Sequence, residues 1–235
     1  MSGAVGPLVE LRVWGTTGVL GSLGRMATGP VRVRRSRGLR FAKLLGTGSA
    51  RTFTPRDADP HHWALLTVVD DEREAAAVAG SGLVRSWSRA SHEQLHVTMR
   101  PLASRGRWSR REPFGPGPFR PPDGAPGGGP VASITRARLR PTRALSFWRA
   151  VPPVVTDLTA TPGLRLALGV GEAPVGLQGT FSLWDSAHDL ETFAHGSAAH
   201  RDAVRRTRPE RWYAEELFAR LAVLDVSGTY DGRPV

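Results

Sequence analysis

The residues best suited to chemistry lie near the C-terminal end of the chain. His200 stands in the segment Ser197-Ala-Ala-His-Arg201, where Ser197 suits the cap of a short helix that runs to about residue 208. Arg201, Arg205 and Arg208 follow at i, i+4 and i+7 and therefore share one helix face. Because arginine binds carboxylates through paired hydrogen bonds, this face predicts a site for an acidic ligand beside the histidine. An ordinary surface helix with a solvated histidine accounts for the same residues.

Aromatic and acidic side chains accompany this helix. Trp212 and Tyr213 lie between two polar segments, so they are candidates for lining an apolar pocket. The other large aromatic residues of this region are expected to be core, namely Phe147, Trp148, Phe181 and Trp184. The acidic residues are expected to form ion pairs with nearby arginines rather than to donate protons, namely Glu210, Glu215 and Glu216.

The composition excludes several classes of site. The chain has no cysteine, so it has no disulfide, zinc–thiolate site, iron–sulfur cluster or thiolate-ligated haem. Its formal net charge of +11 comes almost wholly from arginines, and no nucleic-acid-binding module accompanies them. We therefore expect no nucleic-acid partner. The densest basic group could instead contact anionic lipid, and comprises Arg32, Arg34, Arg35, Arg37 and Arg40.

The hydropathy pattern shows no apolar run long enough to span a bilayer and no apolar segment behind a charged N-terminus. We therefore expect a cytoplasmic protein, with peripheral contact to a membrane surface as a further expectation.

Short segments recur at nearly constant separations along the chain, which indicates an internal duplication. The matched pairs are residues 38–43 with 163–168, 93–95 with 215–217, and 106–108 with 228–230. Each match is short, so chance similarity stays open. Each half is predicted to run strand, helix, strand, strand, helix, strand. This order predicts an α+β fold of two ferredoxin-like βαββαβ repeats, with their sheets paired as in a dimeric α+β barrel.

A segment rich in proline and glycine separates the two halves. Residues 113–130 are unsuited to a helix or a central strand, so they are predicted to be a mobile linker that is dispensable for folding. The predicted domains are therefore residues 1–112 and 131–235. Within the second half, Pro141 suits a first helical turn, and Pro152-Pro153 is expected to end or bend that helix.

The end of the chain resembles that of a known enzyme family. The resemblance is most specific in Gln178-Gly-Thr-Phe-Ser-Leu-Trp184, in Ser197-Ala-Ala-His-Arg201 and in Glu210-Arg-Trp-Tyr213. In the first half it depends mainly on Phe41-Ala-Lys-Leu-Leu-Gly-Thr-Gly48. The chain is similar here to the spheroidene monooxygenase family of acyclic carotenoid 2-ketolases, and its arginine-rich composition suggests an actinobacterial member.

The resemblance implies a cofactor and a reaction. It implies an O2-dependent oxygenase with haem b, which hydroxylates an apolar carotenoid-like substrate on the way to a ketone and takes electrons from an external donor. His200 is then the expected haem ligand, with His195 as second choice. Arg201, Arg205 and Arg208 are expected to contact the propionates. Trp212 and Tyr213 are the candidates for the substrate pocket.

Two other classes of function use the same fold. One is a cofactor-free oxygenase on the same barrel, which activates an electron-rich substrate directly. The other is a non-catalytic α+β barrel that binds a ligand or lipid. A haem absorption band in the purified protein would distinguish the first interpretation from both.

Overall fold

The computed structural model describes residues 6–34, 38–49, 51, 57–115, 129–172 and 177–235. The first half contains β1 (Leu8–Thr16), α1 (Val19–Arg34), β2 (Leu39–Gly48), β3 (Ala58–Val69), α2 (Glu72–Ala79), α3 (Gly82–Ala90) and β4 (Ser91–Gly106). The second half contains β5 (Val131–Leu139), a 3-10 turn (Pro141–Arg143), α4 (Ala144–Ala160), β6 (Leu164–Gly171), β7 (Leu177–Trp184), α5 (Ala187–Gly196), α6 (Ala198–Glu210), β8 (Tyr213–Tyr230) and β9 (Arg233–Pro234).

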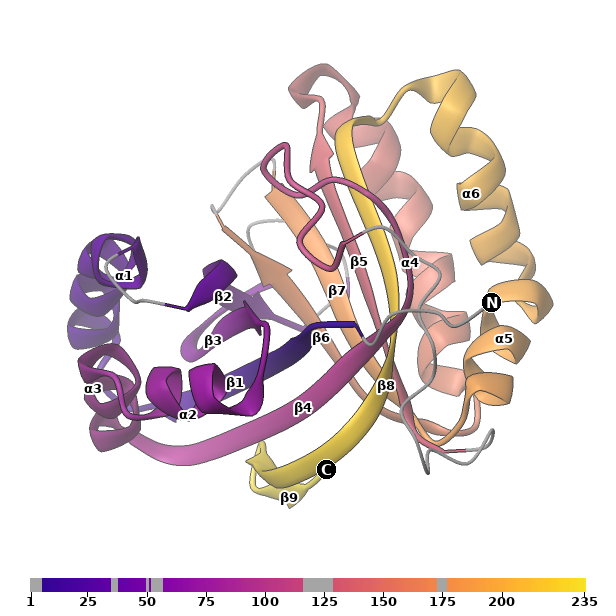
Figure 1. Ribbon diagram of the computed structural model, residues 1–235. Helices are drawn as coiled ribbons and strands as arrows, with labels where there is room; N and C mark the ends of the chain where they lie inside the picture. The colour runs from indigo at the N-terminus through magenta and orange to yellow at the C-terminus, as the bar shows by residue number, and fades with distance from the viewer. Residues whose placement is uncertain (1–5, 35–37, 50, 52–56, 116–128, 173–176) are drawn as a thin grey trace.

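The strands form one antiparallel sheet that closes on itself. Their order is β4-β1-β3-β2-β6-β7-β5-β8-β9, and β4 pairs with β8 as well as with β1. The two halves therefore meet at two seams. The short seam joins β2 to β6, and the long seam joins β4 to β8 from Leu95↔Gly228 to Gly106↔Leu217. In Figure 1 the long strands β4 and β8 run side by side across the middle of the molecule.

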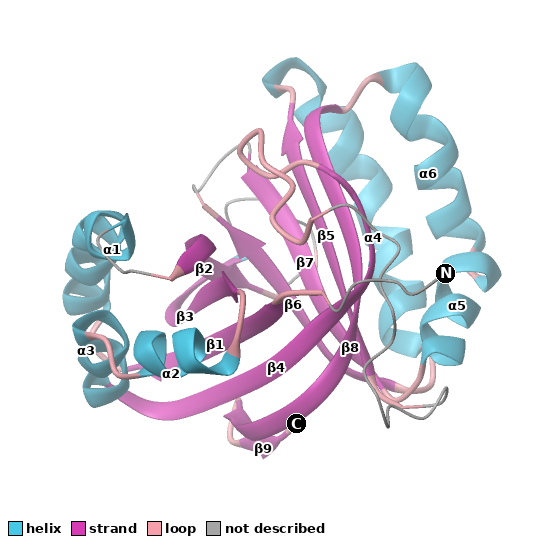
Figure 2. Cartoon of the chain, viewed as in Figure 1, coloured by secondary structure: helices cyan, strands magenta, loops and turns pink. Residues whose placement is uncertain are grey.

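The observed architecture confirms the predicted mixture of helices with a large antiparallel sheet. Figure 2 shows helices α1–α3 on one side of the sheet and α4–α6 on the other. The helices and strands follow the same order in both halves. Two helices precede the last long strand in each half, α2 and α3 in the first and α5 and α6 in the second. β2 and β6, which carry the matched segments at residues 39 and 164, are both the second strand of their half.

Alternation along the strands sorts the core into an inner and two outer layers. In β1, Val9, Leu11 and Val13 join the inner cluster, whereas Leu8 and Trp14 join a cluster under α1–α3. A third cluster lies under α4 and α5 and is built around Trp184 of β7 and Phe193 of α5. The expectation of core aromatic residues is confirmed for Phe181, which is buried in the inner cluster, and for Trp184, which is buried in the third cluster. Because the inner space is filled with apolar side chains, ligands have room only on the outer faces or at the ends of the sheet.

Helix α1 packs through small residues rather than through its leucines. Ser22 and Gly29 are buried, and a Cβ on Gly29 would overlap with the side chain of Leu44 in β2. Leu20 is 85% exposed and Leu23 is also exposed, so α1 does not bury these two leucines. Small side chains are favoured at positions 22 and 29 because the helix lies close to the sheet. The spacing of apolar residues in the sequence does not predict such a contact.

Two expectations about proline segments also change. Helix α4 continues through Pro152 and Pro153 to Ala160, so the prolines do not end it, and both are exposed. The predicted linker begins too early, because Phe114 is 0% exposed and belongs to the inner cluster with Trp108. Residues 116–128 of that linker lie outside the described residues.

A buried charged cluster joins the two halves near Trp108. Arg136 of β5 bonds to Glu215 of β8 and, at 3.2 Å, to Glu172, which follows β6. Glu172 also accepts hydrogen bonds from Lys43 of β2 and from the Trp108 indole. The interpretation of Glu215 as an ion-pair partner of arginine is therefore confirmed. Buried charges of this kind are tolerated only when they are paired, so each half depends on the other at this end.

The position of Phe114 generates a test of the linker boundary. We expect Phe114→Ala to lower the free energy of unfolding by about 3–5 kcal/mol, because it opens a cavity in the inner cluster. The matched control is Leu145→Ala on α4, whose side chain is 67% exposed and whose loss should cost less than about 0.5 kcal/mol. Urea denaturation followed by circular dichroism measures both. Equal, small effects would contradict the burial of Phe114.

Candidate functional site

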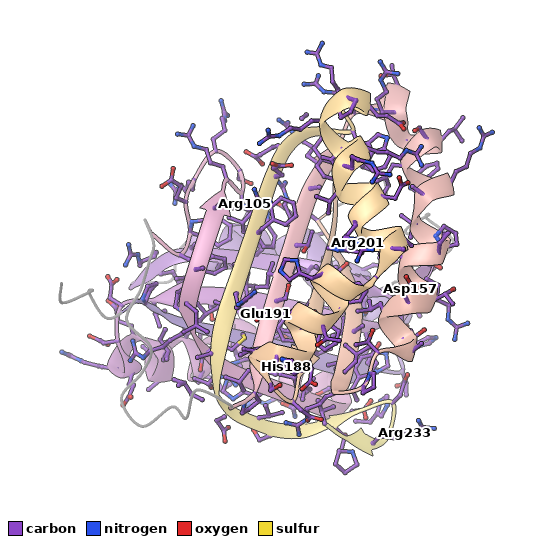
Figure 3. The ribbon with its side chains drawn as sticks, turned by 90° about the vertical axis from the view of Figure 1, so that its right-hand side faces the viewer. Arg105, Asp157, His188, Glu191, Arg201 and Arg233 are labelled. Carbon is purple, nitrogen blue, oxygen red and sulfur yellow. The ribbon has the colours of Figure 1, made fainter. Side chains whose placement is uncertain are left out.

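The helices α4, α5 and α6 position the predicted histidine. Ser197 ends α5 and begins α6, and its hydroxyl oxygen accepts the His200 N–H at 2.9 Å, which confirms the predicted cap. The same hydroxyl donates to Asp157 of α4 at 2.6 Å. One serine therefore fixes the start of α6 against α4. Figure 3 shows Asp157 on α4 and Arg201 on α6 close to this junction.

The His200 ring is held in one tautomer. Its Nδ1 lies 3.1 Å from the carbonyl oxygen of Ala194, and a carbonyl only accepts, so Nδ1 carries the proton. Burial lowers the pKa of His200, and the nearby His195 adds to this shift, although the bond to Ala194 opposes it. At neutral pH the imidazole is therefore neutral, with its lone pair on Nε2. This is the form of histidine that binds metals.

Two aromatic side chains pack in series between the His200 ring and the sheet. The His200 ring lies 5.0 Å from the Phe193 ring, and Phe193 stacks at 5.7 Å on Trp184. Phe193 and Trp184 are buried, so the side of His200 that faces the sheet is apolar. His195 lies in the last turn of α5 and is exposed, as a histidine favoured by the helix dipole would be.

The three arginines of the predicted stripe differ in their contacts. Arg201 donates to the carbonyls of His195 and Gly196 and so caps the end of α5. Arg205 pairs with Asp202 at 2.5 Å, and Arg208 is exposed. The stripe lies on the exposed side of α6. Two of its members thus already have partners within their own helix pair.

Trp212 and Tyr213 are packed rather than open to a ligand. Trp212 is 1% exposed, and its indole donates to Ser146 at 3.1 Å and to Glu210 at 2.9 Å. The Ser146 hydroxyl, then Arg206 and Trp212, hold the pKa of Glu210 down at about 2, so the predicted ion-pair role of Glu210 is confirmed. Burial raises the pKa of Tyr213 to about 12, and Phe147 packs on both rings.

One buried histidine lies outside the predicted site. His62 of β3 is 7% exposed and lies on the inner face with Ala64 and Leu66. Its Nδ1 contacts Asp59 at 2.6 Å, and its Nε2 contacts Glu93 of β4 at 3.1 Å. With both ring nitrogens bonded to carboxylates, His62 has no lone pair for a metal. The even spacing of residues 62, 64 and 66 in a strand could have predicted its burial.

This histidine ties the end of β8 to the first half. Glu93 also accepts the backbone N–H groups of Asp231 and Gly232, at 3.1 and 2.7 Å. The Tyr230 ring lies 4.6 Å from the His62 ring. Asp59, His62 and Glu93 therefore hold the β8–β9 turn.

Comparisons with known proteins identify the family. A spheroidene monooxygenase of Cereibacter sphaeroides is 32% identical over 226 residues, 95% of this chain and 66% of that protein. A spheroidene monooxygenase of Rubrivivax gelatinosus is 35% identical over 223 residues, 94% of this chain and 80% of that protein. The chain belongs to the spheroidene monooxygenase family. No family model matches the sequence.

Membership of the spheroidene monooxygenase family confirms the resemblance found in the sequence and makes the chain an oxidoreductase. The relatives are proteobacterial, so they give no support to the actinobacterial expectation. Among solved structures, an aldoxime dehydratase in complex with butyraldoxime matches with a TM-score of 0.54 at 14% identity, over 94% of this chain and 80% of that one. At that identity the match shows a shared fold alone.

None of the helices in the described ranges combines the length and apolar character needed to cross a bilayer.

The His62 contacts predict a pH dependence of stability. The bond to Asp59 raises the pKa of His62 from 6.5 to about 8, against the effect of burial and with help from Glu93. Because the pKa of His62 is higher in the folded protein than in the unfolded chain, its protonation stabilises the fold. This stabilisation is fully present below pH 6.5 and is lost as the pH rises through about 8. We expect the free energy of unfolding to fall by on the order of 1 kcal/mol between pH 6.5 and 9.

Urea denaturation of two variants isolates the source of this fall. The His62→Gln variant should lose most of this pH dependence of stability. The His188→Gln variant, which changes an exposed histidine of α5, should keep it. A His62→Gln protein whose stability falls as steeply as that of the wild type would show that another group titrates.

Proposed function

We propose that the chain is an O2-dependent monooxygenase that uses haem b and acts on an acyclic carotenoid or a similar apolar polyene. The reaction is hydroxylation of the substrate leading to a ketone, with electrons from an external donor. Family membership supports the reaction class. The observation that carries the cofactor is the tautomer of His200, whose Nδ1 donates to the Ala194 carbonyl and leaves Nε2 as an acceptor.

The residues around His200 fit a haem ligand. A metal-binding histidine usually donates its other ring N–H to a carbonyl or carboxylate, which fixes the ring and makes the free nitrogen more basic. His200 has this arrangement, and its lowered pKa keeps it deprotonated at Nε2 near neutral pH. The alanines at 198, 199 and 203 keep the helix surface around it small. Bound haem would supply the O2 chemistry, while Phe193 and Trp184 exclude water on the sheet side.

The arginines would take different parts in holding the propionates. Arg208 is exposed and can turn to a carboxylate directly. Arg205 would exchange Asp202 for a propionate, and Arg201 would exchange the carbonyls at the end of α5. Because Arg201 supports α5 through those carbonyls, its contribution to haem binding and its contribution to the fold are linked. Trp212 and Tyr213, which pack against Phe147 of α4, would then support the substrate-binding surface from behind rather than by direct exposure.

The fold and the substrate suggest two further parts of this proposal. The matching element order supports two ferredoxin-like repeats that form a single-chain counterpart of a dimeric α+β barrel. An apolar polyene dissolves in membranes, so the protein would meet its substrate at a membrane surface. The exposed Leu20 and Leu23 of α1 support peripheral contact there.

The ligand assignment predicts a spectroscopic result. With added haemin, the wild-type protein should show a Soret band, and His200→Ala should lose it or weaken it greatly, because the mutation removes Nε2, the proposed ligand atom. His195→Ala should keep the band and serves as the matched control on the same helix pair. Circular dichroism checks that each variant is folded.

Three outcomes decide the proposal. Loss of the band in His195→Ala alone would move the ligand from His200 to His195. Absence of the band in the wild type would remove the haem and favour a cofactor-free oxygenase or a ligand-binding barrel. Arg208→Gln should weaken haem retention on dialysis without abolishing the band, since it supplies one contact among several.

A further inference from the structure

Helix α1 turns its larger apolar side chains away from the rest of the protein. Leu20, Leu23 and Val31 are exposed to solvent, and so are Gly24 and Ala27. These positions follow one another at i, i+3, i+4, i+7 and i+11, so they form one continuous surface along the helix, the α1 stripe. A contiguous apolar surface of this kind on a folded protein marks a place where another surface binds.

The opposite face of α1 is the one that meets the sheet. Ser22 and Gly29 are buried there, and Met26 and Val33 pack against the buried cluster under α1–α3. A helix on the surface of a globular protein normally buries its apolar face and exposes its polar face. In α1 the leucines face solvent while a serine and a glycine face the sheet, so packing within the chain does not account for the α1 stripe.

The charge around the α1 stripe is all of one sign. Helix α1 contains three arginines and its neighbour α3 contains two, and neither helix contains an acidic residue. Arg85 and Arg89 of α3 are exposed, and Arg25 of α1 bonds to Ser86 of α3 at 3.3 Å, which holds the two helices together. Two acidic residues of the neighbouring α2 region are already engaged, since Asp70 pairs with Arg40 and Glu74 accepts the backbone N–H of Asp70.

This charge decides which surface covers the α1 stripe. A second copy of the chain would bring the same arginines and the same net charge of +11 against them, so like charges oppose pairing of two α1 helices. A bilayer with anionic headgroups offers the opposite charge to the arginines and an apolar boundary to the leucines. Figure 1 shows α1 at the edge of the molecule with α3 beside it, where a flat surface can reach both helices.

We propose that α1 binds in the plane of an anionic membrane, with the α1 stripe in the acyl boundary and the arginines of α1 and α3 at the headgroups. This inference deepens the membrane contact of the proposed function by naming the helix and the lipid charge, and it rests on that part of the proposed function but not on haem. Figure 2 shows α4–α6, which carry His200, on the other side of the sheet. Membrane binding and haem binding are therefore separate measurements.

Vesicle flotation of the full chain tests the membrane surface. The wild type should bind vesicles of phosphatidylcholine and phosphatidylglycerol in equal parts, and bind several-fold less to phosphatidylcholine alone. Leu20→Glu should lower the partition coefficient on the mixed vesicles about tenfold or more, because it removes an inserted leucine and places a charge in the acyl boundary. Absence of wild-type binding, or equal binding to both kinds of vesicle, would overturn the proposal.

Leu145→Glu on α4 is the matched control. Leu145 is 67% exposed against 85% for Leu20, and the substitution changes the net charge by the same amount on the other side of the sheet. Its binding should stay within about twofold of the wild type, because a charge much farther than a Debye length from the lipid is screened. An equal loss in both variants would show that binding follows overall charge, and a loss in Leu145→Glu alone would place the docking surface on α4–α6. Either result would overturn the proposal.

A dye on a single cysteine reports insertion directly. The chain has no cysteine, so Ala27→Cys in the α1 stripe and Ala160→Cys at the exposed end of α4 each create one labelling site. The emission of an attached nitrobenzoxadiazole dye should rise and shift to shorter wavelength on the mixed vesicles at position 27 and stay unchanged at position 160. Unchanged emission at position 27 would exclude insertion of the α1 stripe.

Analytical ultracentrifugation tests the other way to cover the stripe. Leu20→Glu should leave the sedimentation coefficient of the protein without lipid unchanged. A wild-type dimer that Leu20→Glu dissociates would show that a second copy covers the α1 stripe, and the membrane proposal would then be wrong. The Soret band of haemin-loaded Leu20→Glu should equal that of the wild type. A wild type without that band would remove the haem and leave the vesicle result standing, so the two failures are distinguishable.

Discussion

The pairing of β4 with β8 is the constraint on which the rest of the structure depends. It joins the last long strand of each half over most of its length and closes the sheet. Gly106 and Gly228 lie at opposite ends of this seam, with φ of 90° and 99°. A Cβ on either would overlap with a carbonyl oxygen of the facing strand, that of Glu216 or Gln94. Only glycine allows both the backbone angle and the close approach at these two positions.

Closure of the sheet decides where chemistry can occur. The inner space is filled by the apolar cluster and sealed at its ends by charged groups, the Arg136 cluster at one end and the His62 contacts at the other. The functional surfaces are therefore the two outer faces, each under its own helices. Helix α6 leads into β8 through Arg211, which adopts a left-handed conformation with φ of 51°. The position of His200 thus depends on the strand that closes the sheet.

The sequence predicted the elements well where a local signal exists. The cap Ser197 follows from residue types at short spacing, and the structure confirms it. Features set by contacts between distant segments could not be predicted in this way. Phe114 follows a strand in a proline-rich segment, yet it is buried because the closed sheet leaves a space that it fills.

The same limit applies to the polar residues. Glu10 and His62 were visible as polar residues in apolar strands, but their partners His96 and Glu93 are 86 and 31 residues away. The contacts of Trp212 with α4 likewise depend on how α4 and α6 pack together. Sequence spacing identifies a residue that can do chemistry, and the fold decides whether it faces a ligand, a partner or the core.

The measurement that tests this account most directly is native-state hydrogen exchange of the backbone amides along the β4–β8 seam. If the two halves form one closed sheet, the amides of residues 97–100 and 221–226 should exchange only through global unfolding, with the same free energy as the amides of the β1–β3 pair. If the halves are separate domains joined by a linker, the seam amides will exchange through an opening of much lower free energy. That result would contradict the closed sheet and, with it, the dependence of the His200 site on β8.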